Sequence, residues 1–87
     1  MTPYRIQETK EFSALVAGLS EEGRAALGEL YAALARSPLP GESLLTIKRY
    51  PLIPNAHTVP FRGGLLVYLV LTRRRVIGML GMIGVEP

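Results

Sequence analysis

From Leu65 to Val85 the sequence is LLVYLVL, then TRRR, then VIGMLGMIGV. Two nearly continuous apolar runs joined by a short basic connection predict two strands of a hairpin, each buried on both faces. The Gly63-Gly64 pair in front of the first run supplies positive φ without steric cost, which predicts a second tight turn from a preceding strand. We therefore expect a hairpin in the middle of a sheet, with the rest of the chain organised around it.

The N-terminal half predicts one short strand, Tyr4 to Glu8, and two helices. In the first helix, from about Thr9 to Gly18-Leu19, apolar side chains fall at i, i+3, i+4 and i+7, namely Phe12, Leu15, Val16 and Leu19. Ser20 is placed to cap the second helix, whose stripe is Leu27, Leu30, Tyr31 and Leu34. Ser37-Pro38 ends it, because proline lacks a backbone donor and restricts the residue before it.

The C-terminal half adds strands at Leu44 to Tyr50 and Ala56 to Phe61 before the hairpin. Pro60 interrupts the second of these, so we expect that strand at an edge or bulged at Pro60. The order is β-α-α-β-β-β-β. It predicts an α+β fold with two N-terminal helices packed on one face of a small antiparallel sheet, as a single domain spanning residues 1–87.

The amino-acid composition limits the kinds of functional site that we expect in this chain. The 87 residues contain no cysteine and one histidine, so we expect no disulfide, no metal centre and no cofactor. The N-terminus lacks the layout of a signal peptide, which predicts a cytoplasmic protein. Neither apolar run is long enough to cross a membrane, and three arginines separate the two.

Charge is divided between the two halves. Residues 1–43 carry four basic and six acidic side chains, net −2, whereas residues 44–87 carry six basic and one acidic, net +5. The sheet half therefore suits a polyanion or an acidic partner. The alternative is that these cations are solvated edge and turn residues.

With metal and cofactor chemistry set aside, the residues present suit the cleavage of phosphodiesters. In that reaction cations can stabilise a phosphorane, and one group must move a proton. His57 is the candidate for proton transfer and Arg62 for a phosphate contact. The candidates for RNA binding are Lys48, Arg49, Arg73, Arg74 and Arg75. Each has a structural alternative: His57 shares a predicted face with Val59 and Phe61, and the three consecutive arginines suit a soluble hairpin tip.

Two further features have structural explanations as well. Tyr68, in the middle of an apolar strand, is expected in the core. Gly78, Gly81 and Gly84 recur every third residue, which indicates a bulge, a close backbone approach or a flat surface for another chain.

Taken together, the order of elements and three motifs resemble the RelE/ParE toxin family of bacterial toxin–antitoxin pairs. The motifs are F-x-x-L-V in the first helix, Ala33-Leu34-Ala35-Arg36-Ser37-Pro38 closing the second, and GGLLVYLV followed by RRVIGML in the hairpin. The resemblance implies a small basic protein that cleaves messenger RNA on the ribosome without metal. It also implies a cognate antitoxin peptide wrapped over the protein.

The chain departs from the family at two places. Leu65 and Leu66 stand where family members usually carry an arginine, and the last strand ends at Val85-Glu86-Pro87 instead of continuing into a basic and an aromatic residue. Three readings therefore stay open: a ribosome-dependent endoribonuclease, the gyrase-targeting branch of the family, and a non-catalytic interaction module. The last would be a homodimer or an antitoxin-binding scaffold built on the glycine-spaced strand.

Overall fold

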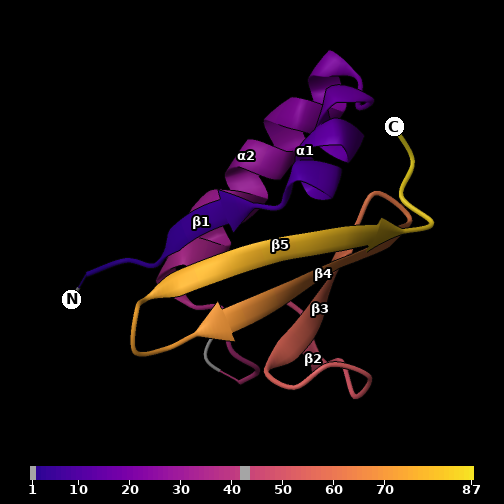
Figure 1. The fold of residues 1–87 in the computed structure, drawn as a ribbon. Helices are drawn as coiled ribbons and strands as arrows, with labels where there is room; N and C mark the ends of the chain where they lie inside the picture. Colours follow the sequence, from indigo (N-terminus) through magenta and orange to yellow (C-terminus); the bar gives the residue numbers. More distant parts are fainter. Residues whose placement is uncertain (1, 42–43) are drawn as a thin grey trace.

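The computed structural model describes residues 2–41 and 44–87, and it has the α+β architecture that the sequence predicts (Figure 1). Its elements are β1 (Arg5–Glu8), α1 (Lys10–Ala17), α2 (Glu21–Arg36), β2 (Lys48–Arg49), β3 (Ala56–Phe61), β4 (Gly64–Leu71) and β5 (Val76–Ile83).

Both helices begin and end where their local signals place them. The Thr9 hydroxyl accepts a hydrogen bond from the Phe12 amide at 3.1 Å, and the Ser20 hydroxyl accepts one from the Gly23 amide at 3.0 Å. Each bond satisfies an amide that the first helical turn leaves unpaired. α2 stops at Arg36, two residues before Pro38, as the sequence predicts.

The sheet has five strands in the order β1-β5-β4-β3-β2. The expectation of a wholly antiparallel sheet is wrong at one ladder, because β1 runs parallel to β5, with Ile6 opposite Ile77. β2 to β5 follow one another through short connections and pair antiparallel. No tight turn joins β1 to its neighbour in the sheet, so nothing local fixes its direction.

Two other strand predictions need correction. The strand expected from Leu44 to Tyr50 shrinks to Lys48–Arg49, which pairs only with Thr58 and His57. Because β2 stops short of Pro60, the missing amide of that proline disrupts no ladder on the β2 side. β3 is regular at Pro60, and the bulge instead lies in the β4–β5 ladder between Val67 and Tyr68.

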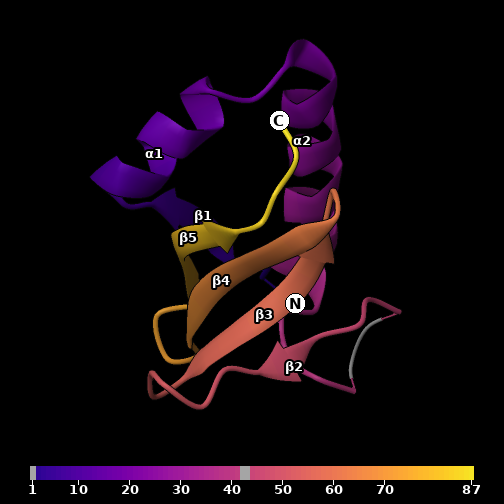
Figure 2. The same ribbon diagram turned by 90° about the vertical axis from the view of Figure 1, so that its right-hand side faces the viewer.

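The hydrophobic core lies between the helices and one face of the sheet. α1 and α2 are on the same side of it (Figures 1 and 2). Their buried side chains, Phe12, Leu27 and Leu34, together with Leu19 between them, pack against Val59, Phe61, Leu66, Tyr68, Val70, Ile77 and Met79. Leu15 departs from its predicted stripe and is 46% exposed.

The opposite face of β4 and β5, called here the open sheet face, has no helix over it (Figure 2). Its residues are Leu65, Val67, Leu69 and Leu71 of β4, paired with Ile83, Gly81, Gly78 and Val76 of β5. Val67 and Val76 are buried, but Leu71 is 39% and Ile83 is 48% exposed. The expectation that both strands are buried on both faces is therefore wrong: the described chain covers one face and leaves an apolar one.

Candidate functional site

His57 lies on the core side of β3, at the end of the sheet where the β4–β5 turn is found. It stands opposite Tyr68 of β4 and Arg49 of β2. The rings of His57 and Tyr68 stack, with centroids 5.8 Å apart and planes at 29°. The buried Tyr68 hydroxyl donates to the Pro38 carbonyl at 2.9 Å, so one tyrosine supports the imidazole and also anchors the segment that follows α2.

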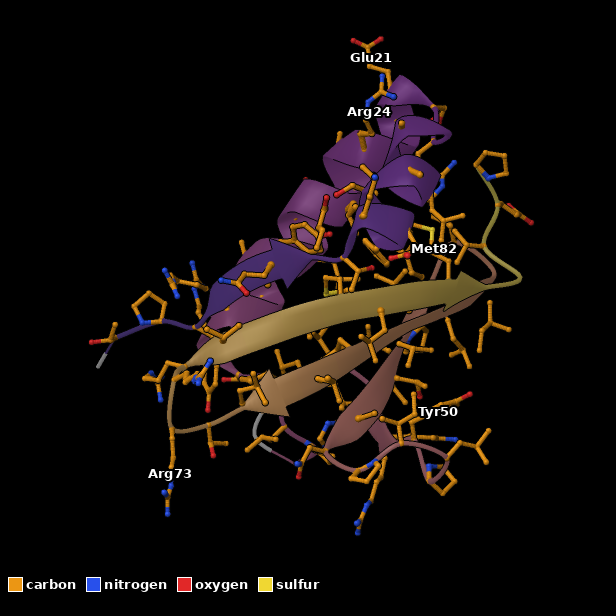
Figure 3. All side chains as sticks on the ribbon, viewed as in Figure 1. Glu21, Arg24, Tyr50, Arg73 and Met82 are labelled. Carbon is orange, nitrogen blue, oxygen red and sulfur yellow. The ribbon has the colours of Figure 1, made fainter. Side chains whose placement is uncertain are left out.

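A hollow of about 520 Å³ opens beside this imidazole. We call it the hairpin-end hollow. Its lining residues are Leu39, Asn55, His57, Val70, Leu71, Thr72, Arg73 and Arg74. They come from four segments: the connection after α2, the start of β3, the end of β4 and the β4–β5 turn. Arg73 extends from that turn away from the sheet (Figure 3).

Backbone geometry fixes the polar rim of the hollow. Asn55 has φ 62°, in the left-handed region that asparagine tolerates better than most residues. Its carbonyl accepts a hydrogen bond from the Val70 amide at 3.1 Å, which joins the start of β3 to the end of β4. In the turn, the Arg75 amide donates to the Thr72 carbonyl at 3.3 Å. The side chains of Asn55 and Thr72 make no hydrogen bond within residues 2–41 and 44–87.

Burial lowers the pKa of His57, and the Arg49 charge lowers this pKa further, while the backbone at Asn55 acts in the opposite direction. The Nδ1 atom is enclosed and has no well-formed hydrogen bond among the described residues. The ordinary pKa of histidine is 6.5, so a lowered pKa makes this imidazole neutral at pH 7. A neutral imidazole can accept a proton.

The other candidate cations are divided between three places. Arg49 is across from His57, whereas Lys48, across from Thr58, projects to the other face of the same edge strand. Arg75 is engaged elsewhere: its Nε donates to the Thr2 carbonyl at 2.6 Å, and its guanidinium lies 4.2 Å from the centre of the Tyr4 ring.

Arg62 is not brought to His57. It follows the last residue of β3, five positions from His57, which corresponds to about 16 Å along a strand. With φ 43° it forms a tight turn with Gly63, and its Nε donates to the Glu86 carbonyl at 3.2 Å. The two side chains predicted to act together therefore lie at opposite ends of β3.

A second hollow, of about 390 Å³, lies between α1 and the C-terminal segment. Leu15, Leu19, Met82 and Val85 give it apolar walls, and it has no imidazole or basic side chain. Within residues 2–41 and 44–87 there is no group of three or more His, Cys, Asp or Glu side chains that could hold a metal ion. None of the helices described is long and apolar enough to cross a membrane.

Comparison of the whole fold with solved structures gives a clear match. No protein-family model and no curated protein sequence matches the chain. The RelBE2 toxin–antitoxin complex of Mycobacterium tuberculosis contains a chain that superposes with a TM-score of 0.75 at 20% identity, over 95% of this chain and 92% of that one. The archaeal RelE-RelB complex of Pyrococcus horikoshii OT3 gives a TM-score of 0.72 at 18% identity, over 94% and 93%. The chain has the RelE fold.

Within this RelE-like fold, five residues of the hollow were not predicted from the sequence: Leu39, Asn55, Val70, Leu71 and Thr72. Asn55 follows Pro54 and precedes a strand, a position that indicates a turn and nothing more specific. Leu39 lies beside the hollow after Pro38, whose carbonyl accepts the Tyr68 hydrogen bond, and it also packs against the core. No sequence motif in the RelE-like chain indicates these contacts, because they join segments that are far apart in the sequence.

Proposed function

We propose that this RelE-like chain is the toxin of a toxin–antitoxin pair and that it binds and cleaves messenger RNA at the ribosome without metal. The observation that carries the proposal is that one hollow brings together His57, Arg73 and Arg74. Support also comes from the RelE fold, found in complexes that pair RelE with RelB. The basic character of residues 44–87 adds to this.

In the proposed reaction the imidazole of His57 takes the proton of a ribose 2′-hydroxyl. The freed oxygen attacks the adjacent phosphorus, and the bond from phosphorus to the 5′-oxygen of the next nucleotide breaks, leaving a 2′,3′-cyclic phosphate. The departing 5′-oxygen takes a proton from water, and the imidazolium of His57 gives its proton to the hydroxide that is left, which restores the neutral imidazole. Arg73 and Arg74 stabilise the extra negative charge of the phosphorane, since such charge stabilisation and proton transfer are what this chemistry requires.

In this scheme the remaining basic side chains increase the affinity for RNA. Arg49 stands beside His57, and Lys48 follows on the same edge strand, so a single strand of RNA can run along β2. Arg62 lies at the other end of β3, so it contacts a phosphate further along the RNA. Arg75, already bound to Thr2, contributes charge to the turn without leaving its place.

Mapping transcript ends after expression of the wild type and its variants tests the proposal. We expect His57→Ala to lower the cleavage rate ~10²- to 10⁴-fold, the usual effect of losing a proton carrier. The paired change Arg73→Ala/Arg74→Ala should also abolish detectable cleavage. Arg62→Ala should weaken RNA binding and leave the maximal rate unchanged, in line with its distance from His57.

Binding is tested separately with a fluorescent single-stranded RNA. Four to five phosphate contacts give a slope of log affinity against log salt of about −3, and removing two arginines should make it shallower by about 1.4. Cleavage that survives His57→Ala unchanged would remove His57 from the mechanism. If the wild type neither cleaves RNA nor binds it at low salt, the nuclease proposal fails.

The open sheet face favours a second candidate function, a non-catalytic interaction module. Gly78 and Gly81 have no atom within 4 Å of the position that a side chain would take, so a partner can approach the backbone closely. Contiguous apolar patches left exposed on a protein surface often mark interaction sites. The proposed occupant is the cognate antitoxin, and a second copy of this chain is the competing one.

Gly78→Lys tests this second role, because the new side chain enters open space on the open sheet face without a clash. We expect Gly78→Lys to abolish binding of the co-expressed neighbouring antitoxin candidate. Gly28→Lys is the matched control, since Gly28 is exposed on α2 and also has nothing within 4 Å. Equal antitoxin binding by both variants would show that the open sheet face is not the interface, and sedimentation of each variant alone reports self-association.

A further inference from the structure

We propose that the hairpin-end hollow holds a single unstacked nucleotide, with the base against its apolar wall and the phosphate between Arg73 and Arg74. This inference rests on the proposed RNA binding and specifies what part of the RNA the site accepts. It makes the hollow a site for one nucleotide and not only a patch of positive charge.

The size of the hollow fits such a ligand. Sites for small molecules and cofactors have volumes of about 300 to 1,000 Å³. The hairpin-end hollow, at about 520 Å³, falls within this range. A plain phosphate site would need only the two arginines and no apolar recess beside them.

The hollow has an apolar part and a basic part, which correspond to the base and the phosphate of a nucleotide. Leu39, Val70 and Leu71 supply an apolar wall, which suits the face of a base. The arginines stand on the β4–β5 turn at the rim, and guanidinium groups match the geometry of phosphate oxygens. Leu71 is 39% exposed, so apolar surface is available to a ligand.

Two further polar side chains of the hollow, those of Asn55 and Thr72, have unused hydrogen-bonding capacity. Asn55 offers an amide donor and acceptor, and Thr72 offers a hydroxyl. Asn55 is fixed by the bond of its carbonyl to the Val70 amide, so its side chain projects from a defined backbone position. Such groups can pair with the edge of a base that has left its stack.

A base can enter the hollow only after it has left its neighbours. In a duplex both faces of a base are covered and its pairing edge is occupied, whereas proteins that recognise RNA sequence take up splayed, unpaired bases. The site is therefore selective for single-stranded RNA, loops and ends. Duplex RNA is excluded from it.

Titration of the isotope-labelled full chain with AMP, adenosine and inorganic phosphate, followed by NMR, tests the inference. We expect AMP to bind at least about fivefold more tightly than phosphate, the lower end of what one stacked base contributes. Amide shifts should be confined to residues 55–57 and 70–75 and to Leu39. Adenosine should move the same amides weakly, since it lacks the phosphate.

Three variants separate the two halves of the ligand. Arg73→Ala/Arg74→Ala should remove the advantage of AMP over adenosine, whereas Asn55→Gly should lower AMP affinity and leave phosphate affinity unchanged. Glycine is the chosen replacement because it accepts the positive φ at this position. Lys10→Ala/Arg24→Ala is the control with the same charge change; Arg24 lies at the far end of α2 (Figure 3) and this control should bind AMP normally.

Two results would overturn the inference: AMP binding no tighter than phosphate, or amide shifts that lie outside the hollow. If oligonucleotides still bind with a salt slope near −3 in that case, the proposed RNA binding stands and only the nucleotide site fails. If AMP binds in the hollow but single-stranded RNA is neither bound nor cleaved, the proposed function fails and the nucleotide site stands.

Discussion

Replacing Tyr68 by phenylalanine should destabilise the fold and disturb the lining of the hollow, because the change removes one buried hydrogen bond. The buried hydroxyl donates to the Pro38 carbonyl at 2.9 Å, and Pro38 is itself fully buried. Tyr68→Phe keeps the ring beside His57 and leaves that carbonyl without its partner. An unsatisfied buried acceptor costs about 1 to 3 kcal/mol, and a chain of this size loses roughly 4 to 8 °C in Tm per kcal/mol.

Urea and thermal unfolding followed by circular dichroism measure the effect, and Tyr4→Phe is the matched control. The Tyr4 hydroxyl makes no hydrogen bond within the described chain, and its ring contact with Arg75 survives the change, so its free energy of unfolding should move by less than about 0.5 kcal/mol. Tyr68→Phe should also weaken nucleotide binding, because Pro38 positions Leu39. Equal stability of the two variants would refute the role given to this hydrogen bond.

Two further predictions concern the helices and pH. Gly28→Ala should stabilise the protein by about 1 kcal/mol, because Gly28 is exposed within α2 with nothing within 4 Å of the new methyl group. Gly23→Ala in the same helix should give no such gain: its methyl group would lie 2.6 Å from the Pro87 carbonyl, which accepts bonds from the Ser20 amide and hydroxyl. Because the pKa of His57 is lowered from 6.5 by folding, the unfolded chain binds this proton more readily. Stability should therefore fall as pH drops from about 6.5 through the folded-state pKa, and urea midpoints of His57→Gln over pH 4 to 8 should lack this component.

The sequence by itself determined the elements whose causes are local. The helices follow the 3.6-residue period of their apolar side chains and begin at Thr9 and Ser20, whose hydroxyls bond amides three residues on. The hairpin of β4 and β5 follows from two apolar runs and a basic turn. The RelE-like order of elements, and with it the fold class, could be predicted from the sequence for the same reason.

Only the tertiary structure decided how these elements meet. An alternating pattern reports that a residue is buried, but it does not name the neighbouring strand, so the parallel pairing of β1 with β5 could not be predicted. Likewise a continuous apolar run does not say which of its two faces the chain can cover, and two helices cover one. His57 lines one hollow with Arg73 and Arg74, and is separated from Arg62, because strand pairing brings sequence-distant residues together and spreads a strand's own residues by about 3.3 Å each.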